Sequence, residues 1–150
     1  MTLLIATLAT LLWTIHSPPQ ENSETKQLRY CHMRLAQLFQ QLLTRDVDRT
    51  KGDYFFLTNE GQHLLFTYDN GSDINPYFSG PVTGLLTLFP DNTLSLVTKS
   101  NHPQIPTYRE ERLLEHASKL SMRCFSSNNT FSNNWFSMIE RPLFLHITLE

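Results

Sequence analysis

The feature that most constrains the fold is a change of hydrophobic period about a third of the way along the chain. Between residues 23 and 45, apolar side chains recur every three or four positions, which places them on one face of a helix. They are Leu28, Cys31, Leu35, Leu38 and Leu42. Asn22 or Ser23 can cap the start of this helix, and Glu24 suits its first turn. After the charged connector 46–52 the period changes and strand-like runs begin, so the chain combines helix with sheet.

Four strand-like runs follow, at residues 54–58, 63–68, 82–89 and 93–98. Short segments rich in turn residues join them, so the runs predict two successive hairpins. Residues 143–149 alternate in the same way and predict a final strand.

A second helix is expected over residues 108–124. Thr107 and Glu110 form a capping-box pattern at its start. The apolar residues that would share one face of this helix are Leu113, Ala117, Leu120 and Cys124. The predicted order is therefore α-β-β-β-β-α-β.

This order describes an α+β fold, in which an antiparallel sheet of about five strands has two amphipathic helices packed on one face. With 40% hydrophobic and 17% charged residues, the composition is that of a globular protein. No internal repeat or second domain boundary is visible. We therefore expect residues 18–150 to form a single α+β domain.

Residues 1–17 differ from the rest in composition. From 3 to 15 they are apolar or hydroxyl-bearing, with no Asp, Glu, Lys or Arg, and a polar, proline-broken stretch follows. A run of this length falls short of the roughly 20 residues of a membrane span but fits the core of a secretory signal. We expect a signal peptide at 1–17, no stable membrane span, and a secreted or lumenal protein. The alternative is a buried N-terminal element of a cytosolic domain.

Two cysteines and two sequons agree with an oxidising compartment. Cys31 and Cys124 each lie on the apolar face of an expected helix, so they form a candidate disulfide. In a cytosolic protein they would instead be two small buried thiols. Asn70 and Asn128 begin Asn-x-Ser/Thr triplets in expected loops and are the candidate glycosylation sites.

The sequence carries no signature of catalysis or of nucleic-acid binding. The net charge is −2 and the basic residues are scattered, so no footprint for nucleic acid is present. Cys31 and His32 are adjacent, but neighbouring side chains on a helix point about 100° apart and cannot act as a nucleophile and base. The histidines form no metal-binding pair, and five glycines leave little room for a phosphate loop. We expect no enzyme, no metal and no cofactor.

Trp135 and Phe136 adjoin a loop rich in Ser and Asn and are the candidate interaction residues, although such aromatics also pin a loop to its own core. The leading hypothesis is a small secreted or lumenal glycoprotein that acts as a non-catalytic protein-binding factor. One alternative is an intracellular adaptor or scaffold domain with an uncleaved N-terminus. The other is a small-ligand carrier or an enzyme with an unrecognised site. The partner's identity and the oligomeric state are not indicated by the sequence.

Overall fold

The computed structural model describes residues 22–44, 55–102, 104–137 and 142–150. The expected signal peptide at 1–17 lies outside these residues. Within them, no helix is long and apolar enough to cross a membrane.

The first described element is the helix α2 (Ser23–Thr44), which confirms the helix expected from the sequence. Its start is capped as expected, because Asn22 Oδ1 accepts hydrogen bonds from the Thr25 backbone N–H at 2.9 Å and from the Thr25 hydroxyl at 2.7 Å. Cys31, Leu35 and Leu38 are buried on its inner face.

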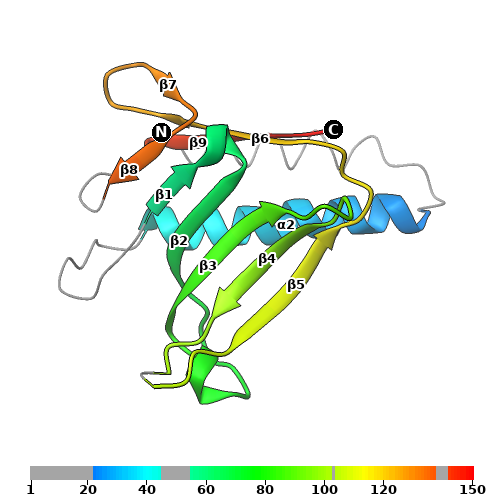
Figure 1. Ribbon diagram of the computed structural model, residues 1–150, viewed down its shortest axis with the longest axis vertical. Coiled ribbons are helices and arrows are strands. Elements are labelled where there is room, and N and C mark those ends of the chain that lie inside the picture. The colour runs from blue at the N-terminus through cyan, green and yellow to red at the C-terminus, as the bar shows by residue number, and fades with distance from the viewer. Residues whose placement is uncertain (1–21, 45–54, 103, 138–141) are drawn as a thin grey trace.

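Six strands form one antiparallel sheet, in the order β5-β4-β3-β2-β1-β8 (Figure 1). They are β1 (Phe55–Thr58), β2 (His63–Asp69), β3 (Pro81–Leu88), β4 (Leu94–Lys99), β5 (Tyr108–Leu114) and β8 (Trp135–Ser137). The four strands predicted between residues 54 and 98 are confirmed as β1 to β4. A single turn of 3-10 helix, η2 (Asn59–Gly61), joins β1 to β2. Helix α2 packs along one face of this sheet.

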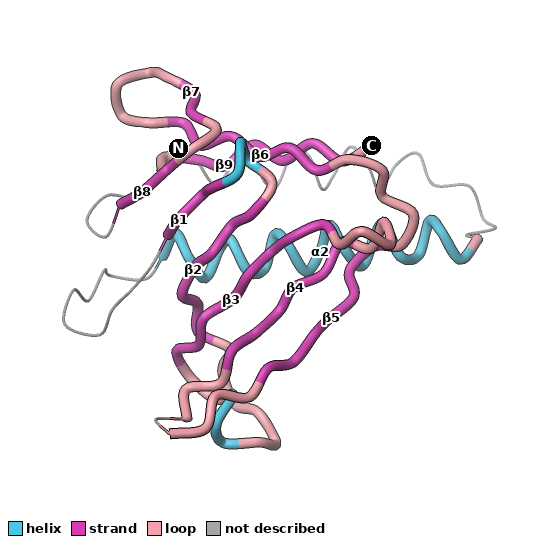
Figure 2. Tube along the Cα trace, viewed as in Figure 1, coloured by secondary structure: helices cyan, strands magenta, loops and turns pink. Residues whose placement is uncertain are grey.

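A second, three-stranded sheet lies beside the first, in the order β7-β6-β9. Its strands are β6 (Leu120–Phe125), β7 (Phe131–Ser132) and β9 (Phe144–Leu149), and β9 confirms the predicted final strand. The chain leaves β7, adds β8 to the edge of the six-stranded sheet, and returns to pair β9 with β6 (Figure 2).

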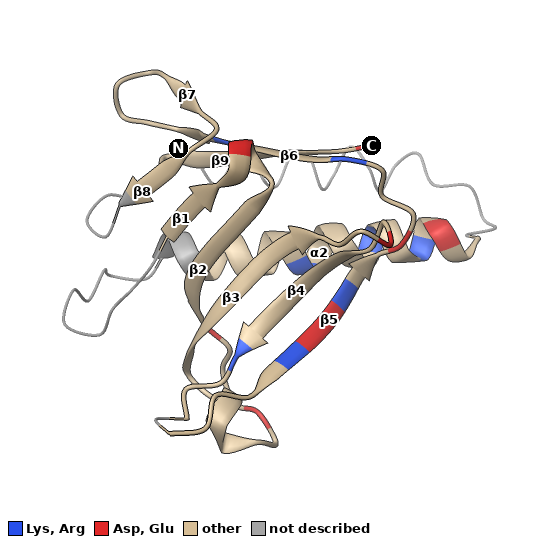
Figure 3. Cartoon of the chain, viewed as in Figure 1, with Lys and Arg blue, Asp and Glu red and all other residues tan. Residues whose placement is uncertain are grey.

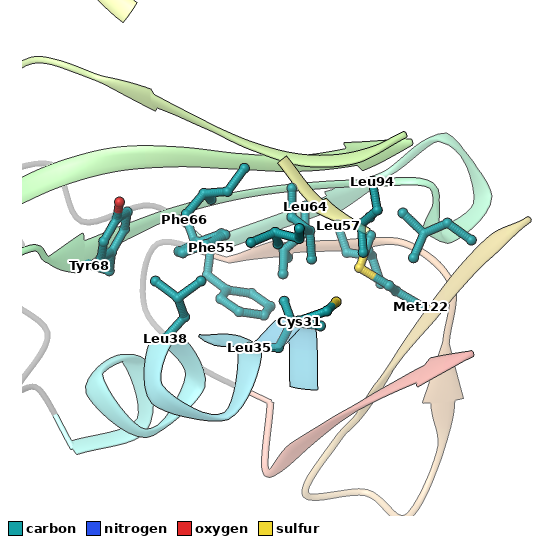
Figure 4. Packing of buried hydrophobic residues seen from close by; sticks show 14 of the residues in the cluster. Cys31, Leu35, Leu38, Phe55, Leu57, Leu64, Phe66, Tyr68, Leu94 and Met122 are labelled. Atoms are coloured by element: carbon teal, nitrogen blue, oxygen red, sulfur yellow. The ribbon is translucent and has the colours of Figure 1, made fainter. Parts of the chain in front are cut away.

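The core fills the space between α2 and the two sheets. Figure 4 shows side chains from the helix, from β1 and β2, and from β6 meeting there. Leu38, Leu57, Leu64 and Met122 have no exposed surface. Burial of such large apolar side chains supplies most of the driving force for folding.

The predicted fold class is wrong, because the described residues hold one α-helix and nine strands rather than two α-helices and about five strands. The segment expected to be a second helix, 108–124, forms β5 and β6 with a turn between them. The four apolar residues expected on the inner face of that helix are all buried: Leu113, Ala117, Leu120 and Cys124. The pattern therefore identified buried side chains correctly but predicted the wrong secondary structure.

A contact between residues 77 positions apart in the sequence accounts for part of the error. Glu111 occupies an inward-facing position of β5, where a strand pattern would have an apolar residue. The apolar–polar alternation of the strand is therefore not visible in the sequence. Glu111 accepts hydrogen bonds from Arg34 Nε at 3.0 Å and Nη2 at 3.1 Å, and from the Tyr30 hydroxyl at 2.5 Å. These partners are on α2, and the hydrogen bond to Glu111, together with burial, raises the pKa of Tyr30. Local sequence does not reveal that an inward carboxylate is paired in this way.

Candidate interaction surface at the loop end of the sheet

Two connections meet at one end of the six-stranded sheet (Figure 2). One joins β2 to β3 and contains the short 3-10 helix η3 (Pro76–Phe78); the other joins β4 to β5. Asn101 connects them, because its backbone N–H donates to the Tyr77 carbonyl at 2.8 Å and its side-chain amide donates to the Ser79 carbonyl at 3.0 Å. We call residues 70–80, 100–102 and 104–108 the loop end.

Asp73 organises the first of these connections. Its backbone N–H donates to Ser79 Oγ at 2.9 Å, and its Oδ1 accepts from the Asn75 N–H at 2.9 Å. Arg109 of β5 donates twice to the same carboxylate, from Nη1 at 2.6 Å and from Nη2 at 3.1 Å. The Arg109 hydrogen bond is the main reason that the pKa of Asp73 is lowered to about 2. The guanidinium also lies over the Phe78 ring, 4.2 Å from its centroid.

His102 organises the second connection. Its Nδ1 accepts hydrogen bonds from the backbone N–H groups of Gln104 at 3.1 Å and Ile105 at 2.9 Å. Its ring meets the ring of Tyr77 edge-on, with centroids 4.3 Å apart. Side chains from the two connections therefore hold each other in one arrangement.

This end of the sheet presents large apolar side chains to solvent. Ile74 is fully exposed, Ile105 and Tyr108 are each 64% exposed, and Tyr77 is 48% exposed. All four belong to the loop end. Exposed aromatic and aliphatic residues on pre-ordered loops are typical of protein-binding surfaces. None of these residues belongs to a recognisable motif, and their only signal in the sequence is apolar side chains near Asn, Ser and Pro.

The two residues chosen from the sequence for interaction lie elsewhere, on the opposite edge strand β8. Trp135 is half-buried and packs against the core, so its surroundings fit the alternative that it pins its own loop. Phe136 points to the other face, is 72% exposed, and lies 5.9 Å from the ring of Phe56. Neighbouring residues on a strand face opposite ways, so the two side chains cannot share one surface.

Cys31 and Cys124 lie in the same core cluster, on α2 and β6, as two free buried thiols. Burial raises the pKa of Cys31 to about 11 and that of Cys124 to about 12. Both groups are therefore protonated at neutral pH and poor nucleophiles. The expected disulfide is not formed in this structure.

The two candidate glycosylation sites have different surroundings. Asn128 is exposed in the tight turn between β6 and β7, where Ser126 N–H donates to the Thr130 carbonyl at 3.0 Å. Asn70 is half-buried at the base of the loop end, and its side-chain amide donates to the Phe78 carbonyl at 2.8 Å. A glycan on Asn128 would project into solvent, whereas one on Asn70 would crowd the Phe78 carbonyl.

Other chemistry in the described residues is sparse. No group of three His, Cys, Asp or Glu among them could hold a metal ion. His63 Nδ1 and Thr87 Oγ1 are 2.7 Å apart, but Thr87 is buried and offers no reach to a substrate. Two shallow grooves have volumes of about 240 and 250 Å³. Both are smaller than the roughly 300–1,000 Å³ typical of ligand sites.

No protein-family model matches this chain, and the comparison with curated proteins gives no match either.

Proposed function

We propose that this chain is a non-catalytic binding factor that contacts another protein through the loop end. The observation that carries the proposal is the coexistence of solvent-exposed Ile74, Tyr77, Ile105 and Tyr108 with loops fixed by the Asp73–Arg109 ion pair. Apolar side chains give affinity only if ordering them costs little entropy on binding. The ion pair and the Asn101 hydrogen bonds meet that condition before any partner arrives.

Replacing exposed apolar residues tests this role. Ile74→Asp and Ile105→Asp should each weaken saturable binding of the labelled chain to partner-bearing cells by roughly tenfold or more, because each introduces a charge that must be desolvated. Met33→Asp is the matched control, since Met33 is 59% exposed on α2, away from the loop end. The control should bind normally. Equal loss in all three variants, or no loss in the two loop-end variants, would count against the proposal.

We further propose that the protein acts outside the cell or in a lumenal compartment. The apolar run at residues 3–15 supports this, as does the exposure of Asn128 at a turn where a glycan fits. The test is intact mass and N-terminal sequencing of the chain made in secreting eukaryotic cells, with and without glycosidase. Export predicts a processed N-terminus and a glycan on Asn128 that Asn128→Gln removes.

A second candidate is an intracellular adaptor that uses the same surface. It is favoured by the two free thiols, which suit a reducing compartment. Retention in the cell with an intact Met1 and no glycan would select the adaptor. That outcome leaves the loop-end test unaffected, so the compartment and the surface are decided separately.

A further inference from the structure

The sheet edges of this protein are not equally protected. Among the described strands β5, β8, β7 and β9 form edges, and exposed edges invite pairing with other strands unless charge, brevity or a cover prevents it. Strand β5 carries four charged residues in seven, while β8 has three residues and β7 has two. The charged segments along β5 are visible in Figure 3. Strand β9 has six residues, FLHITL, with no Asp, Glu, Lys or Arg. It is the long, uncharged edge of the described sheets.

The hydrogen-bond pattern gives the direction in which the backbone groups of β9 point. Glu150 and Lys119 exchange both backbone hydrogen bonds, at 3.1 and 3.3 Å. Bonded pairs alternate along an antiparallel ladder, so Thr148, His146 and Phe144 also bond toward β6. The N–H and C=O groups of the intervening residues therefore point away from β6, toward the edge with which no described strand pairs. Those residues are Leu145, Ile147 and Leu149.

The side chains of Leu145, Ile147 and Leu149 lie at the boundary of the hydrophobic core. Each faces the core side of the sheet and is only half-buried, whereas the residues opposite them on β6 are buried. Those opposite residues are Cys124, Met122 and Leu120. A further strand beside β9 would cover these half-exposed apolar side chains. It would also form hydrogen bonds with their outward-pointing backbone N–H and C=O groups.

We propose that β9 pairs with β9 of a second copy of this chain, antiparallel and centred on Ile147. In that register Ile147 lies opposite Ile147 of the other copy, and Leu145 lies opposite Leu149. Opposed residues of a sheet share a face, so these apolar side chains continue the core side of both sheets. In this register the outward-pointing N–H and C=O groups of Leu145, Ile147 and Leu149 form reciprocal hydrogen bonds with those of the other copy.

A second copy fits this edge because the strand is complementary to itself. Apolar residues lie at equal steps on both sides of Ile147, and the polar residues His146 and Thr148 exchange places across the two-fold axis. The side-chain carboxylate of Glu150, which follows the strand, is already paired with Lys119 at 3.0 Å. One strand pair buries less than the roughly 1,200 Å² at which stable complexes begin, so the dimer should be reversible.

Sedimentation of the full chain at increasing concentration tests the association. The wild-type mass should double, with a dissociation constant of roughly 10–100 micromolar. Thr148→Lys places a charge on the exposed face of the edge and should weaken association at least tenfold. Ser127→Lys, in the exposed turn between β6 and β7, is the matched control and should dimerise normally. Thermal unfolding of each variant confirms that it is folded.

Cysteine cross-linking tests the register. Opposed bonded residues have Cα atoms about 5.5 Å apart, within disulfide reach, so Ile147→Cys should give a covalent dimer on mild oxidation. His146→Cys should not, because the two copies of residue 146 lie two positions out of register. Wild-type protein oxidised in the same way should give no covalent dimer under denaturing, non-reducing conditions, because its own thiols are buried. A wild-type chain that stays monomeric to several hundred micromolar, a Thr148→Lys variant that dimerises fully, or cross-linking through residue 146 would overturn the proposal.

Discussion

Arg109 of β5 donates two hydrogen bonds to the carboxylate of Asp73 in the β2–β3 loop. The distances are 2.6 Å from Nη1 to Oδ2 and 3.1 Å from Nη2 to Oδ1. The two residues are 36 positions apart in the sequence. Their contact connects the β2–β3 loop to the strand that follows the second loop. This pair, the Asn101 hydrogen bonds and the hydrogen bonds of His102 to Gln104 and Ile105 order the backbone that carries the exposed apolar side chains of the loop end.

Removing the arginine should loosen the loop end without unfolding the protein. Because an exposed ion pair contributes little to global stability, Arg109→Ala should change the melting temperature only slightly. Its effect on binding to partner-bearing cells should be larger, roughly tenfold, because the loops must then be ordered on binding. Arg112→Ala is the control, since Arg112 is exposed on the same strand, 3.6 Å from Glu110. Similar binding by both variants would contradict the role of the pair.

Acid should release the same pair only at very low pH. The pKa of Asp73 is lowered to about 2 in the folded protein, against about 3.9 in an unfolded chain. A carboxylate with a depressed folded pKa contributes stability above the unfolded value and loses it as pH falls through the folded value. The difference in urea midpoint between wild type and Asp73→Asn should therefore be constant above about pH 5 and shrink between about pH 4 and 2. A difference that vanishes already at pH 5 would be inconsistent with the paired carboxylate.

Two glycines with the same backbone handedness should respond differently to alanine. Gly61 has φ +86°, and a Cβ there would overlap the backbone of Met122 on β6. Gly71 has φ +68°, and a Cβ there meets no atom within 4 Å. Gly71→Ala should cost about 1–2 kcal/mol from backbone strain alone, and Gly61→Ala should cost more than about 3 kcal/mol. Urea unfolding measures both, and equal losses would show that β6 does not press against Gly61.

The thiols give a direct check on the core. Because Cys31 and Cys124 are buried and their pKa values are raised to about 11 and 12, a thiol reagent should not label native protein at pH 8 within minutes. Denaturant without reductant should expose two reactive thiols per chain. Finding none under those conditions would mean that the two cysteines are bridged, as the sequence alone suggested.

The helix and the first four strands could be predicted because their hydrophobic period is local. Leu35 and Leu38 repeat at helical spacing, and residues such as Leu64 and Phe66 alternate along a strand. The period of 108–124 could not be read in this way. Leu113 and Leu120 have helical spacing by coincidence, since a turn that includes His116 at φ +63° separates two strands there. The inward position of Glu111 depends on Arg34, which is 77 residues away.

The loop end could not be predicted either, for a related reason. Asp73 and Tyr77 lie in a segment whose composition indicates only a loop. Their order comes from Arg109 and Asn101, which are distant in the sequence but lie at the same end of the sheet. Trp135 and Phe136 were conspicuous in the sequence because they follow a polar loop. Alternation along β8 sends one to the core and the other to solvent, which no composition argument reveals.

Site-specific photo-cross-linking shows which surface of the chain contacts its partner. A photoreactive phenylalanine analogue is placed at Tyr77 in one preparation and at Met33 in another, and each is irradiated on cells that bind the chain saturably. We expect a discrete adduct from position 77 that excess unlabelled chain abolishes, and no such adduct from position 33. Cross-linking from position 33 alone, or equally from both positions, would contradict the assignment of the binding surface to the loop end.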